Sequence, residues 1–451
     1  MTSHVSQTAT EDWRYIAEGG STIVFSYNGP VHSSLDNKVL RLRKISISVG
    51  PVGRPKGLDD PAFAFQQRVI LRLVPDESLP HLEVVKVEKK WLRLLADAAE
   101  ANRPEVRRAE DRIDWDRETA VLADNLIGGS GLAVEIKPKW GFLPCPDYLS
   151  PTTRRIKTRT CRFCMHAYHK DAAEKHVPSA FCPLDLYSGE EHRVRVALHA
   201  LWDAWMQTDG GINNLRIFAS GRVLRPTTDV CLSRSLLTST ESTTSHSSVD
   251  ALRIEFINAL LPTLMTTRIL RLLSFLQRTL DPLDIEGVAA LWARIHGDKD
   301  ADAPLGLGEG VPEPTLDEWT RFVDAYLATS QTRTNTCAVE SDPVADREEL
   351  RYYCLAYLLS ATFKDCSVVI RAGSHPGPET LDTAADGQEE HQDAHTCRKT
   401  TSEVKLIDLD VKSIKRLAKW EKLDREIVTA YAQVETPRTC RDSLAVMRRF
   451  P

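Results

Sequence analysis

The sequence predicts an α+β protein with two unequal lobes, a small strand-rich N-terminal lobe and a larger C-terminal lobe. Three observations predict this fold class. The first 125 residues contain a glycine turn between apolar strands. A glycine-rich linker follows at 128–131, and most of the remaining chain has helical periodicity interrupted by short apolar strands. We therefore place the lobe boundary near Asn125, with lobes at 1–125 and 126–451.

Turn and cap signals set the elements of the N-terminal lobe. Glu18-Gly19-Gly20-Ser21 is typical of a turn into a strand, because glycine tolerates backbone conformations that other residues avoid. Asp59-Asp60-Pro61 is a helix start, with acidic cap candidates and proline in the first turn. The expected elements are strands at 22–26, 38–47 and 120–122, and helices at 61–73 and 82–100.

The larger lobe combines four predicted strands with six predicted helices. The strands are expected at 132–136, 214–220, 366–371 and 403–409. The helices are expected at 188–206, 250–279, 283–296, 315–330, 343–362 and 412–431, the first and fourth opened by capping boxes. The Ser/Thr-rich segment 233–249 and the Gly, Pro, His and acid-rich segment 372–402 are expected to be disordered insertions.

Composition excludes several classes of protein. The 451 residues carry 58 Lys and Arg against 63 Asp and Glu, a net charge of −5, with 42% hydrophobic residues. These values exclude a disordered chain, a collagen-like fibre and a highly basic nucleic-acid scaffold. The N-terminus has no secretory pattern. Charges interrupt the most apolar stretch, 252–280, so we expect a packed helix pair there and not a membrane span. Ten scattered cysteines do not form a secreted disulfide framework, so we expect a soluble, reduced, intracellular protein. We also expect a monomer without membrane insertion.

Two clusters of basic residues stand out against the acidic background. Residues 136–170 contain one acid, Asp147, and eight cations: Lys137, Lys139, Arg154, Arg155, Lys157, Arg159, Arg162 and Lys170. A second cluster, Lys412, Lys415, Arg416 and Lys419, has the spacing of one helix face. If the clusters converge, the ligand is a small, densely charged anion or a nucleic-acid backbone. Few aromatic residues accompany the densest cations, which disfavours single-stranded nucleic acid. A solvated basic face with distant counter-charges is the alternative.

Candidate parts for phosphoryl transfer are spread along the chain. A kinase must cover phosphates, hold Mg²⁺ with carboxylates and orient an acceptor hydroxyl. The turn at 18–22 could cover phosphates, and Arg41 could reach them as the strand lysine of a kinase does. Asp408 and Asp410, two apart at a strand end and expected on the same face, suit Mg²⁺. Asp365 could accept a hydrogen bond from the acceptor hydroxyl. A plain hairpin turn, a surface arginine and a helix N-cap are the structural alternatives.

A Cys/His pattern within the basic run must be weighed as a zinc site. Cys161-x-x-Cys164-x-His166, with Cys182 further on, has suggestive spacing. A closed site needs four ligands, a second compact pair is missing, and the surrounding cations would oppose Zn²⁺. We therefore expect no structural zinc.

Six motifs, in order, resemble those of inositol-pentakisphosphate 2-kinases. The two long insertions resemble those of the fungal members of this family. They are Glu135-Ile136-Lys137-Pro138-Lys139 with Gly141-Phe142-Leu143-Pro144, Arg162-Phe163-Cys164-Met165-His166, Pro183-Leu184-Asp185-Leu186-Tyr187-Ser188-Gly189, Asn213-Asn214-Leu215-Arg216-Ile217-Phe218, Lys364-Asp365-Cys366-Ser367, and Ile407-Asp408-Leu409-Asp410. The start of the chain, with Glu18-Gly19-Gly20 and Val39-Leu40-Arg41, also fits. The resemblance spans nearly the whole chain.

The resemblance implies a protein-kinase-like fold, with inositide-binding insertions in an enlarged C-terminal lobe. It implies ATP- and Mg²⁺-dependent phosphorylation of the 2-hydroxyl of inositol 1,3,4,5,6-pentakisphosphate, giving inositol hexakisphosphate (phytate), in the nucleus or cytoplasm. The catalytic residues would be Asp365, Lys137 and Asp408, with Asp408 and Asp410 holding the metal. The nucleotide would contact Glu18, Gly19, Gly20, Ser21, Thr22, Arg41, Asp124 and Glu135. The inositide would contact Lys137, Lys139, His166, Lys170, Asn213, Asn214, Arg216, Lys412, Arg416 and Trp420.

Some features depart from the family pattern, and other functions stay open. Trp420 stands where a tyrosine is expected, and the zinc site of plant members has no clear counterpart between Leu232 and Cys337. The main alternative is a non-catalytic inositide-binding or scaffold protein of the same fold, but Asp365 and Asp408 are both present. Net charge argues against a nucleic-acid binder, and the missing HRD and DFG motifs argue against a protein kinase. Lower inositol phosphates remain open as side substrates.

Overall fold

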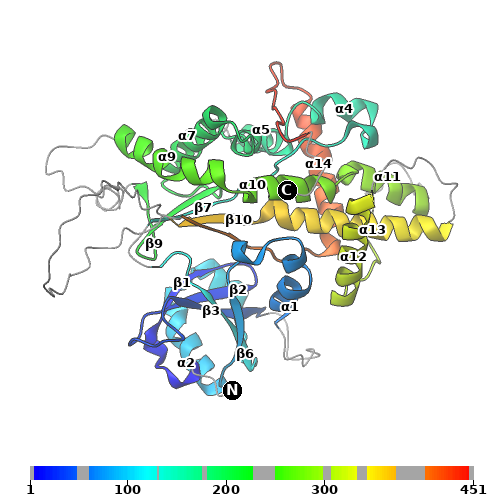
Figure 1. The fold of residues 1–451 in the computed structure, drawn as a ribbon. Helices are drawn as coiled ribbons and strands as arrows, with labels where there is room; N and C mark the ends of the chain where they lie inside the picture. The colour runs from blue at the N-terminus through cyan, green and yellow to red at the C-terminus, as the bar shows by residue number, and fades with distance from the viewer. Residues whose placement is uncertain are drawn as a thin grey trace, which may run out of the picture.

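The computed structural model describes residues 5–47, 60–128, 132–174, 180–226, 249–297, 306–332, 343–371 and 402–445. It is a mixed α and β structure built on two antiparallel sheets. Figure 1 shows the N-terminal sheet at the lower end of the molecule and the C-terminal sheet near its middle. The predicted insertions 233–249 and 372–402 lie outside the described residues, except for their last residues, Val249 and Ser402.

The N-terminal sheet has the strand order β1-β2-β3-β6-β4, with β5 paired to β3. Its strands are β1 (Trp13–Glu18), β2 (Thr22–Tyr27), β3 (Lys38–Ser46), β4 (Leu82–Lys86), β5 (Asp111–Ile113) and β6 (Thr119–Asp124). The predicted hairpin and its return strand are confirmed. Leu40 and Leu42 of β3 are 0% and 2% exposed, and they bury one face of the sheet against α2 (Lys89–Ala99). Alternation of buried and exposed side chains along a strand produces this one-sided core.

One predicted helix begins too early. The charged segment 82–100 was expected to be helical throughout, but its first five residues form β4, which pairs with β6. Val84 and Val85 are β-branched and fit a pleated strand better than a helix. The helical pattern is genuine only from Lys89, where α2 starts.

The C-terminal sheet has the strand order β11-β10-β7-β8-β9. Its strands are β7 (Leu132–Ile136), β8 (Leu215–Ala219), β9 (Arg222–Val223), β10 (Ser367–Arg371) and β11 (Glu403–Ile407). All four predicted strands of this half are confirmed, although the last three are shorter than expected. Every residue of β7 is buried, as in a strand that is covered on both faces.

Most helices of the C-terminal half lie above the C-terminal sheet or to its right in Figure 1. They are α4 (Pro151–Lys157), α5 (Arg162–Glu174), α6 (Pro183–Leu186), α7 (Glu191–Gln207), α9 (Val249–Thr266), α10 (Ile269–Thr279), α11 (Asp284–His296), α12 (Leu316–Thr332), α13 (Pro343–Asp365) and α14 (Leu417–Tyr431). The helix pair expected in the apolar stretch 252–280 is confirmed as α9 and α10, and the predicted helix 343–362 extends to Asp365. The predicted helix at 412 begins later, because Lys412 and Ser413 precede a short 3-10 helix, η7 (Ile414–Arg416). In the described ranges no single helix could cross a membrane by length and composition; α9 with α10 and α11 passes only as a pair bent by 60°.

Helix α1 (Pro61–Arg68) links the two halves of the molecule. Asp60 caps it, accepting hydrogen bonds from the backbone N–H groups of Ala62 and Phe63, as its sequence predicts. Phe65 packs edge-on against Trp319 of α12 at 5.6 Å between ring centroids. The helix therefore belongs to the large core that contains the C-terminal sheet. In sequence it nevertheless comes before β4, β5 and β6 of the N-terminal sheet.

Candidate active site

Three motif residues meet at one edge of the C-terminal sheet because of its strand order. Lys137 directly follows β7, Asp365 ends α13 just before β10, and Asp408 directly follows β11. Strand β10 lies between the other two, and the register aligns the end of each neighbouring strand with the start of β10. Strand pairing thus brings together Lys137 and Asp408, which are 271 positions apart in sequence.

Ion pairs connect this group into one cluster. Lys137 Nζ lies 3.0 Å from Asp408 Oδ2, Lys139 Nζ lies 3.2 Å from Asp365 Oδ1, and Lys412 Nζ lies 2.9 Å from Asp365 Oδ2. The three lysine side chains are only 12–14% exposed, while the two aspartates are about half exposed. The carboxylates therefore face solvent over a nearly buried layer of cations. The two basic clusters of the sequence do converge, through Lys139 and Lys412.

The cluster shifts the pKa values of its own members. Burial opposes the charge of Asp365, but Lys412, Lys139 and Lys137 outweigh it and hold the pKa of the carboxyl below its usual value. Burial also opposes the charge of Lys137, yet Asp408 and Asp365 raise its pKa overall. For Lys139 burial dominates, and its pKa is lowered. Asp365 is consequently an ionised carboxylate at neutral pH.

A second set of oxygen atoms adjoins Asp408. The Ser367 hydroxyl lies 2.7 Å from Glu135 Oε1 and 3.4 Å from Asp408 Oδ2. Arg216 lies 3.7 Å from the other oxygen of Glu135. Carboxylate and hydroxyl oxygens close to one another are the hard ligands that Mg²⁺ prefers. The backbone carbonyl of Asp410 accepts a 2.9 Å hydrogen bond from the Thr362 hydroxyl.

Asp408 and Lys139 have left-handed backbone conformations, with φ of 60° and 62°. Such values are costly for residues with a side chain and persist only where the surroundings impose them. They also correct one expectation: Asp408 lies beyond the end of β11, so the two-residue alternation of a strand does not place Asp410 on the same face. Asn214 holds the chain before Lys139, because its backbone and side chain both bond to Lys137.

Gln277 of α10 fixes the turn that carries Lys139. It is 0% exposed, and its amide nitrogen lies 3.0 Å from the Lys139 carbonyl and 2.9 Å from the Phe363 carbonyl. Its amide oxygen accepts a 2.7 Å hydrogen bond from the N–H of Gly141. A Cβ on Gly141 would come within 2.8 Å of the Tyr187 ring, so this position requires glycine. Sequence reasoning missed Gln277; a lone amide in the apolar run of α10 was the available signal.

Helix α5 carries His166 and Lys170 beside this cluster. Burial, followed by Arg162, Lys170, His169 and Lys139, lowers the pKa of His166 to about 4. Its ring is therefore neutral at physiological pH and is surrounded by cations. Lys170 is exposed, and so are Asn213, before β8, and Arg416 of η7.

Other cations of the basic run have structural partners. Lys157 is 1% exposed and lies 2.8 Å from Asp424 and 2.5 Å from Asp284. Arg162 lies 2.8 Å from the same Asp424. For these two residues the counter-charges are distant in sequence, as the alternative supposed, but Lys157 is buried and does not lie on a solvated face. Trp420 of α14 is partly buried in the large core.

The predicted nucleotide residues lie in the N-terminal sheet, apart from Glu135. The Glu18 carboxylate is buried between Lys44, at 2.8 Å, and Arg103, at 2.9 Å. Asp124 pairs with Lys38 at 2.7 Å. These contacts stay within the N-terminal half and do not join the two acids to the lysine and aspartate cluster. The turn is open, because no atom would lie within 4 Å of a Cβ added at Gly19 or Gly20. Ser21 and Thr22 follow these glycines into β2. Arg41 of β3 is partly exposed.

Comparison with known proteins decides the family. A family-level description of inositol-pentakisphosphate 2-kinases matches residues 15–426. The chain belongs to the inositol-pentakisphosphate 2-kinase family. An inositol-pentakisphosphate 2-kinase of Cryptococcus neoformans is 32% identical over 435 residues, covering 94% of each chain. Proteins of the same name are 26% identical in Arabidopsis thaliana, over 93% of each chain, and 29% identical in Danio rerio, over 47% of this chain and 44% of the fish protein.

Membership of the inositol-pentakisphosphate 2-kinase family confirms the sequence-based recognition and makes this protein a kinase. It favours the catalytic interpretation over a binding or scaffold protein. The match begins in β1 and ends in α14, so it includes both sheets and every residue of the lysine and aspartate cluster. The alignment with the fungal relative also runs across the long insertions.

Proposed function

We propose that this kinase transfers the γ-phosphoryl group of ATP to the 2-hydroxyl of inositol 1,3,4,5,6-pentakisphosphate, giving inositol hexakisphosphate. One observation carries the proposal beyond family membership: Asp365 is held between Lys139 and Lys412, with Lys137 and Asp408 beside it. An acceptor-side carboxylate surrounded by cations is what transfer to a hydroxyl of a polyanion requires.

Asp365 orients the acceptor hydroxyl. Its oxygens are half exposed, and its lowered pKa keeps it ionised and ready to accept the hydroxyl's hydrogen bond. The same low pKa makes it a weak proton acceptor. A loose phosphoryl-transfer transition state needs little base assistance, so positioning is the larger contribution. Lys137 and Lys139 offset the charge that spreads over the transferring phosphoryl group.

The inositide occupies the converged basic clusters. Each phosphate carries about −1.5 to −2 charges, so five phosphates bring roughly −8 to −10. The neutral His166 ring would take up a proton more readily once phosphates offset the repulsion of the neighbouring cations. The proposed contacts are Lys137, Lys139, His166, Lys170, Asn213, Asn214, Arg216, Lys412, Arg416 and Trp420.

Mg²⁺ fits the oxygen atoms at the end of β11. Asp408 is half exposed, and the Ser367 hydroxyl and the Glu135 carboxylate adjoin it, so the donors have the chemistry that Mg²⁺ requires. Asp408 would hold the ion with help from Asp410, and the bound ion would neutralise charge on the nucleotide phosphates. The nucleotide would also contact the turn at 18–22, Arg41, Asp124 and Glu135. Glu18 would contact the nucleotide only through its backbone, because its carboxylate is already paired with Lys44 and Arg103.

The proposed arrangement is a two-lobed, protein-kinase-like fold with lobes at 1–125 and 126–451. The division is supported by the change from one sheet to the other between β6 and β7. The packing of α1 on α12 means that the helix would move with the C-terminal lobe. A monomer in the nucleus or cytoplasm completes the proposal, and light scattering of the purified protein tests the monomer.

The first experiment is to incubate purified protein with Mg-ATP and inositol 1,3,4,5,6-pentakisphosphate and to separate the products by anion exchange. Formation of the hexakisphosphate, lost in an Asp408→Ala variant that still folds, is the expected result. Tight inositide binding without product would instead support the binding-protein alternative. If the protein neither binds the inositide nor forms product, the proposed substrate is wrong.

A further inference from the structure

Lys364, which directly precedes Asp365, turns its side chain into the interior of the protein. The side chain is 2% exposed, whereas that of Asp365 is 52% exposed. The ammonium lies 2.5 Å from Oδ2 of Asp281, a residue between α10 and α11 whose side chain is 6% exposed. A buried lysine requires a partner of this kind. The last turn of α13 therefore directs one residue into the core and the next into the site.

Three aromatic rings lie around the same ammonium. Its nitrogen is 4.6 Å from the ring centroid of Tyr357, 5.2 Å from that of Phe142 and 5.9 Å from that of Trp140. An aromatic face attracts a cation within about 6 Å, most strongly where water is excluded. Tyr357 lies two turns earlier on α13, but Trp140 and Phe142 belong to the turn that follows Lys139. One buried charge therefore contacts both the helix end before Asp365 and the turn after Lys139.

We propose that Lys364 is a positioning residue for phosphoryl transfer, because its ammonium fixes the end of α13, with Asp365, against the turn that carries Lys139. The inference rests on the proposed function, in which Asp365 orients the acceptor hydroxyl. Lys364 is buried, so it acts on the reaction through the 3.2 Å contact between Lys139 and Asp365. A misplacement of about 1 Å in such a site costs about 10²-fold in rate.

The contacts of Lys364 add to those of Gln277 and do not repeat them. Gln277 donates to the backbone carbonyls of Lys139 and Phe363, so it sets the spacing of the two main chains. Lys364 instead joins side chains of the same two segments, including the Trp140 ring beside Lys139. The main-chain contacts leave the side chains free to rotate, and the buried ammonium removes that freedom.

Packing alone does not fix these rings, because a cavity adjoins them. The side chains that contact the ammonium all line this cavity: Trp140, Phe142, Tyr357 and Asp281. Side chains beside a cavity lack neighbouring atoms on one side, so dispersion contacts hold them less firmly than in a close-packed core. The ion pair and the attraction between charge and ring supply what packing lacks. An apolar side chain of the same length, such as methionine, is flexible and would fill the space without fixing the rings.

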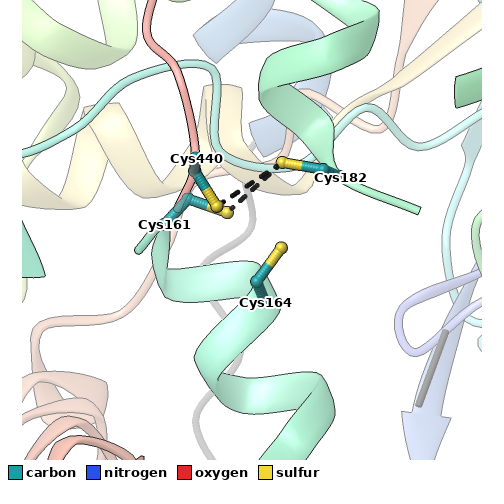
Figure 2. A group of neighbouring side chains, drawn as sticks. All are labelled: Cys161, Cys164, Cys182 and Cys440. Carbon is teal, nitrogen blue, oxygen red and sulfur yellow. Dashed lines mark hydrogen bonds between the residues drawn. The ribbon is translucent and has the colours of Figure 1, made fainter. Parts of the chain in front are cut away.

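Helix α5, which carries His166 and Lys170, is held by contacts that do not involve Lys364. At its start the sulfur atoms of four buried cysteines lie within 4.8 Å of one another: Cys161, Cys164, Cys182 and Cys440 (Figure 2). The N–H of Cys440 also donates a 2.8 Å hydrogen bond to the carbonyl of Arg159. The structure thereby corrects the sequence pattern, in which no fourth cysteine joined the other three. Replacing Lys364 should therefore leave the proposed inositide contacts of α5 in place.

A variant without the charge pair tests the inference. Replacing Lys364 alone would leave the carboxylate of Asp281 buried without its partner and destabilise the chain, so both residues are changed together. Lys364→Met with Asp281→Asn keeps the length of one side chain and the shape of the other. We expect kcat for hexakisphosphate formation to fall by roughly ten-fold or more, while KM for the inositide stays within about two-fold.

Arg351→Met with Glu318→Gln is the matched control. Arg351 also lies on α13, with its Nε 2.6 Å from Glu318 Oε1, but it precedes Asp365 by about 21 Å along the helix. This variant should keep the wild-type kcat. If the Lys364 and Asp281 variant keeps it as well, the lysine serves stability alone and the inference is wrong. A loss of kcat/KM that comes only from KM would assign Lys364 to binding and would also overturn it.

Amide hydrogen exchange gives a second measurement that does not need turnover. In the variant that lacks the charge pair, the amides of residues 137–143 and 361–366 should exchange roughly ten-fold faster, with the rest of the chain unchanged. A uniform increase, or no increase in these two segments, would contradict a positioning role. If the wild type forms no hexakisphosphate, the proposed function fails and this inference fails with it. If the wild type forms product and the variant keeps the wild-type kcat, this inference alone fails.

Discussion

At the scale of single residues, Asp365 is the most informative side chain. It carries one oxygen toward Lys139 and the other toward Lys412, and its pKa is lowered. Asp365→Asn keeps the shape but removes the charge that we propose orients the acceptor hydroxyl. We expect turnover to fall by about 10²- to 10⁴-fold, with inositide binding near normal. Product chromatography and titration calorimetry measure the two quantities. Asp317→Asn, on the surface of α12, is the control, and wild-type turnover in Asp365→Asn would remove this residue from the mechanism.

His166 predicts a pH dependence of folding stability. Its folded pKa of about 4 lies below the ordinary value of 6.5, so the unfolded chain binds the proton more readily. The contribution of this residue to stability is therefore complete above pH 6.5 and declines as the pH falls toward 4. Thermal unfolding of the ligand-free protein between these pH values should show a smaller loss of stability in His166→Gln than in the wild type. Parallel curves would mean that His166 is ordinarily basic.

Single residues also mark the limit of what the sequence could predict. Lys137, Asp365 and Asp408 were identified because each lies in a motif at the end of an apolar strand. The ion-pair partners of Lys157 could not be identified from the sequence, because Asp284 and Asp424 lie 127 and 267 residues further along the chain. The grouping of Cys440 with Cys182 was missed for the same reason, because the two residues are 258 positions apart in sequence. Glu18 looked available for a nucleotide, but two cations supplied by folding bury its carboxylate.

At the scale of elements, α10 supports the turn that carries Lys139. Gln277→Met removes the bonds to the carbonyls of Lys139 and Phe363 and the bond from Gly141, at nearly constant volume. Each unsatisfied buried group costs about 1–3 kcal/mol, so we expect the free energy of unfolding to fall by about 3 kcal/mol. Turnover should fall as well, because Lys139 has a left-handed backbone that these bonds hold. Denaturant unfolding and steady-state rates measure both effects.

The control for this prediction is Gln207→Met, at the exposed end of α7. It should leave both stability and turnover unchanged. A loss of stability in Gln277→Met without any loss of turnover would mean that α10 serves the core alone. Rescue of turnover by Gln277→Glu at low pH, where a protonated acid can again donate, would support the positioning role.

Elements were predictable where local pattern and tertiary context agree. Strand β7 appears with its expected bounds, because an uninterrupted apolar run suits a strand buried on both faces. Strand β4 was taken for helix because its charged residues lead directly into α2. The β-branched Val84 and Val85 were a weak strand signal, and pairing with β6 decides the conformation. The helix pair in 252–280 was predicted from its interrupting charges, but the position of the break, at 267–268, was not, because neither glycine nor proline marks it.

At the scale of the whole molecule, net charge and local charge have opposite signs. The chain carries −5 overall, yet the lysines around Asp365 are nearly buried and are held in place by the sheet edge. A charge count along the sequence suggested this site, but the strand order β11-β10-β7 was needed to bring the two basic clusters together. A fold of this kind concentrates positive potential in one place without a basic protein surface.

That concentration predicts product-limited turnover. The product carries one phosphate more than the substrate, so the same cations hold it more tightly, and its release should limit the rate. Raising the salt concentration from about 0.01 M to about 0.15 M shortens the screening length from about 30 Å to about 8 Å. We expect KM to rise, kcat to increase roughly two-fold or more, and a pre-steady-state burst of product to shrink. Lys412→Ala should weaken this salt dependence, whereas Lys86→Ala, at an exposed position in β4, should not. A kcat independent of salt and no burst at low salt would instead place the slow step in phosphoryl transfer.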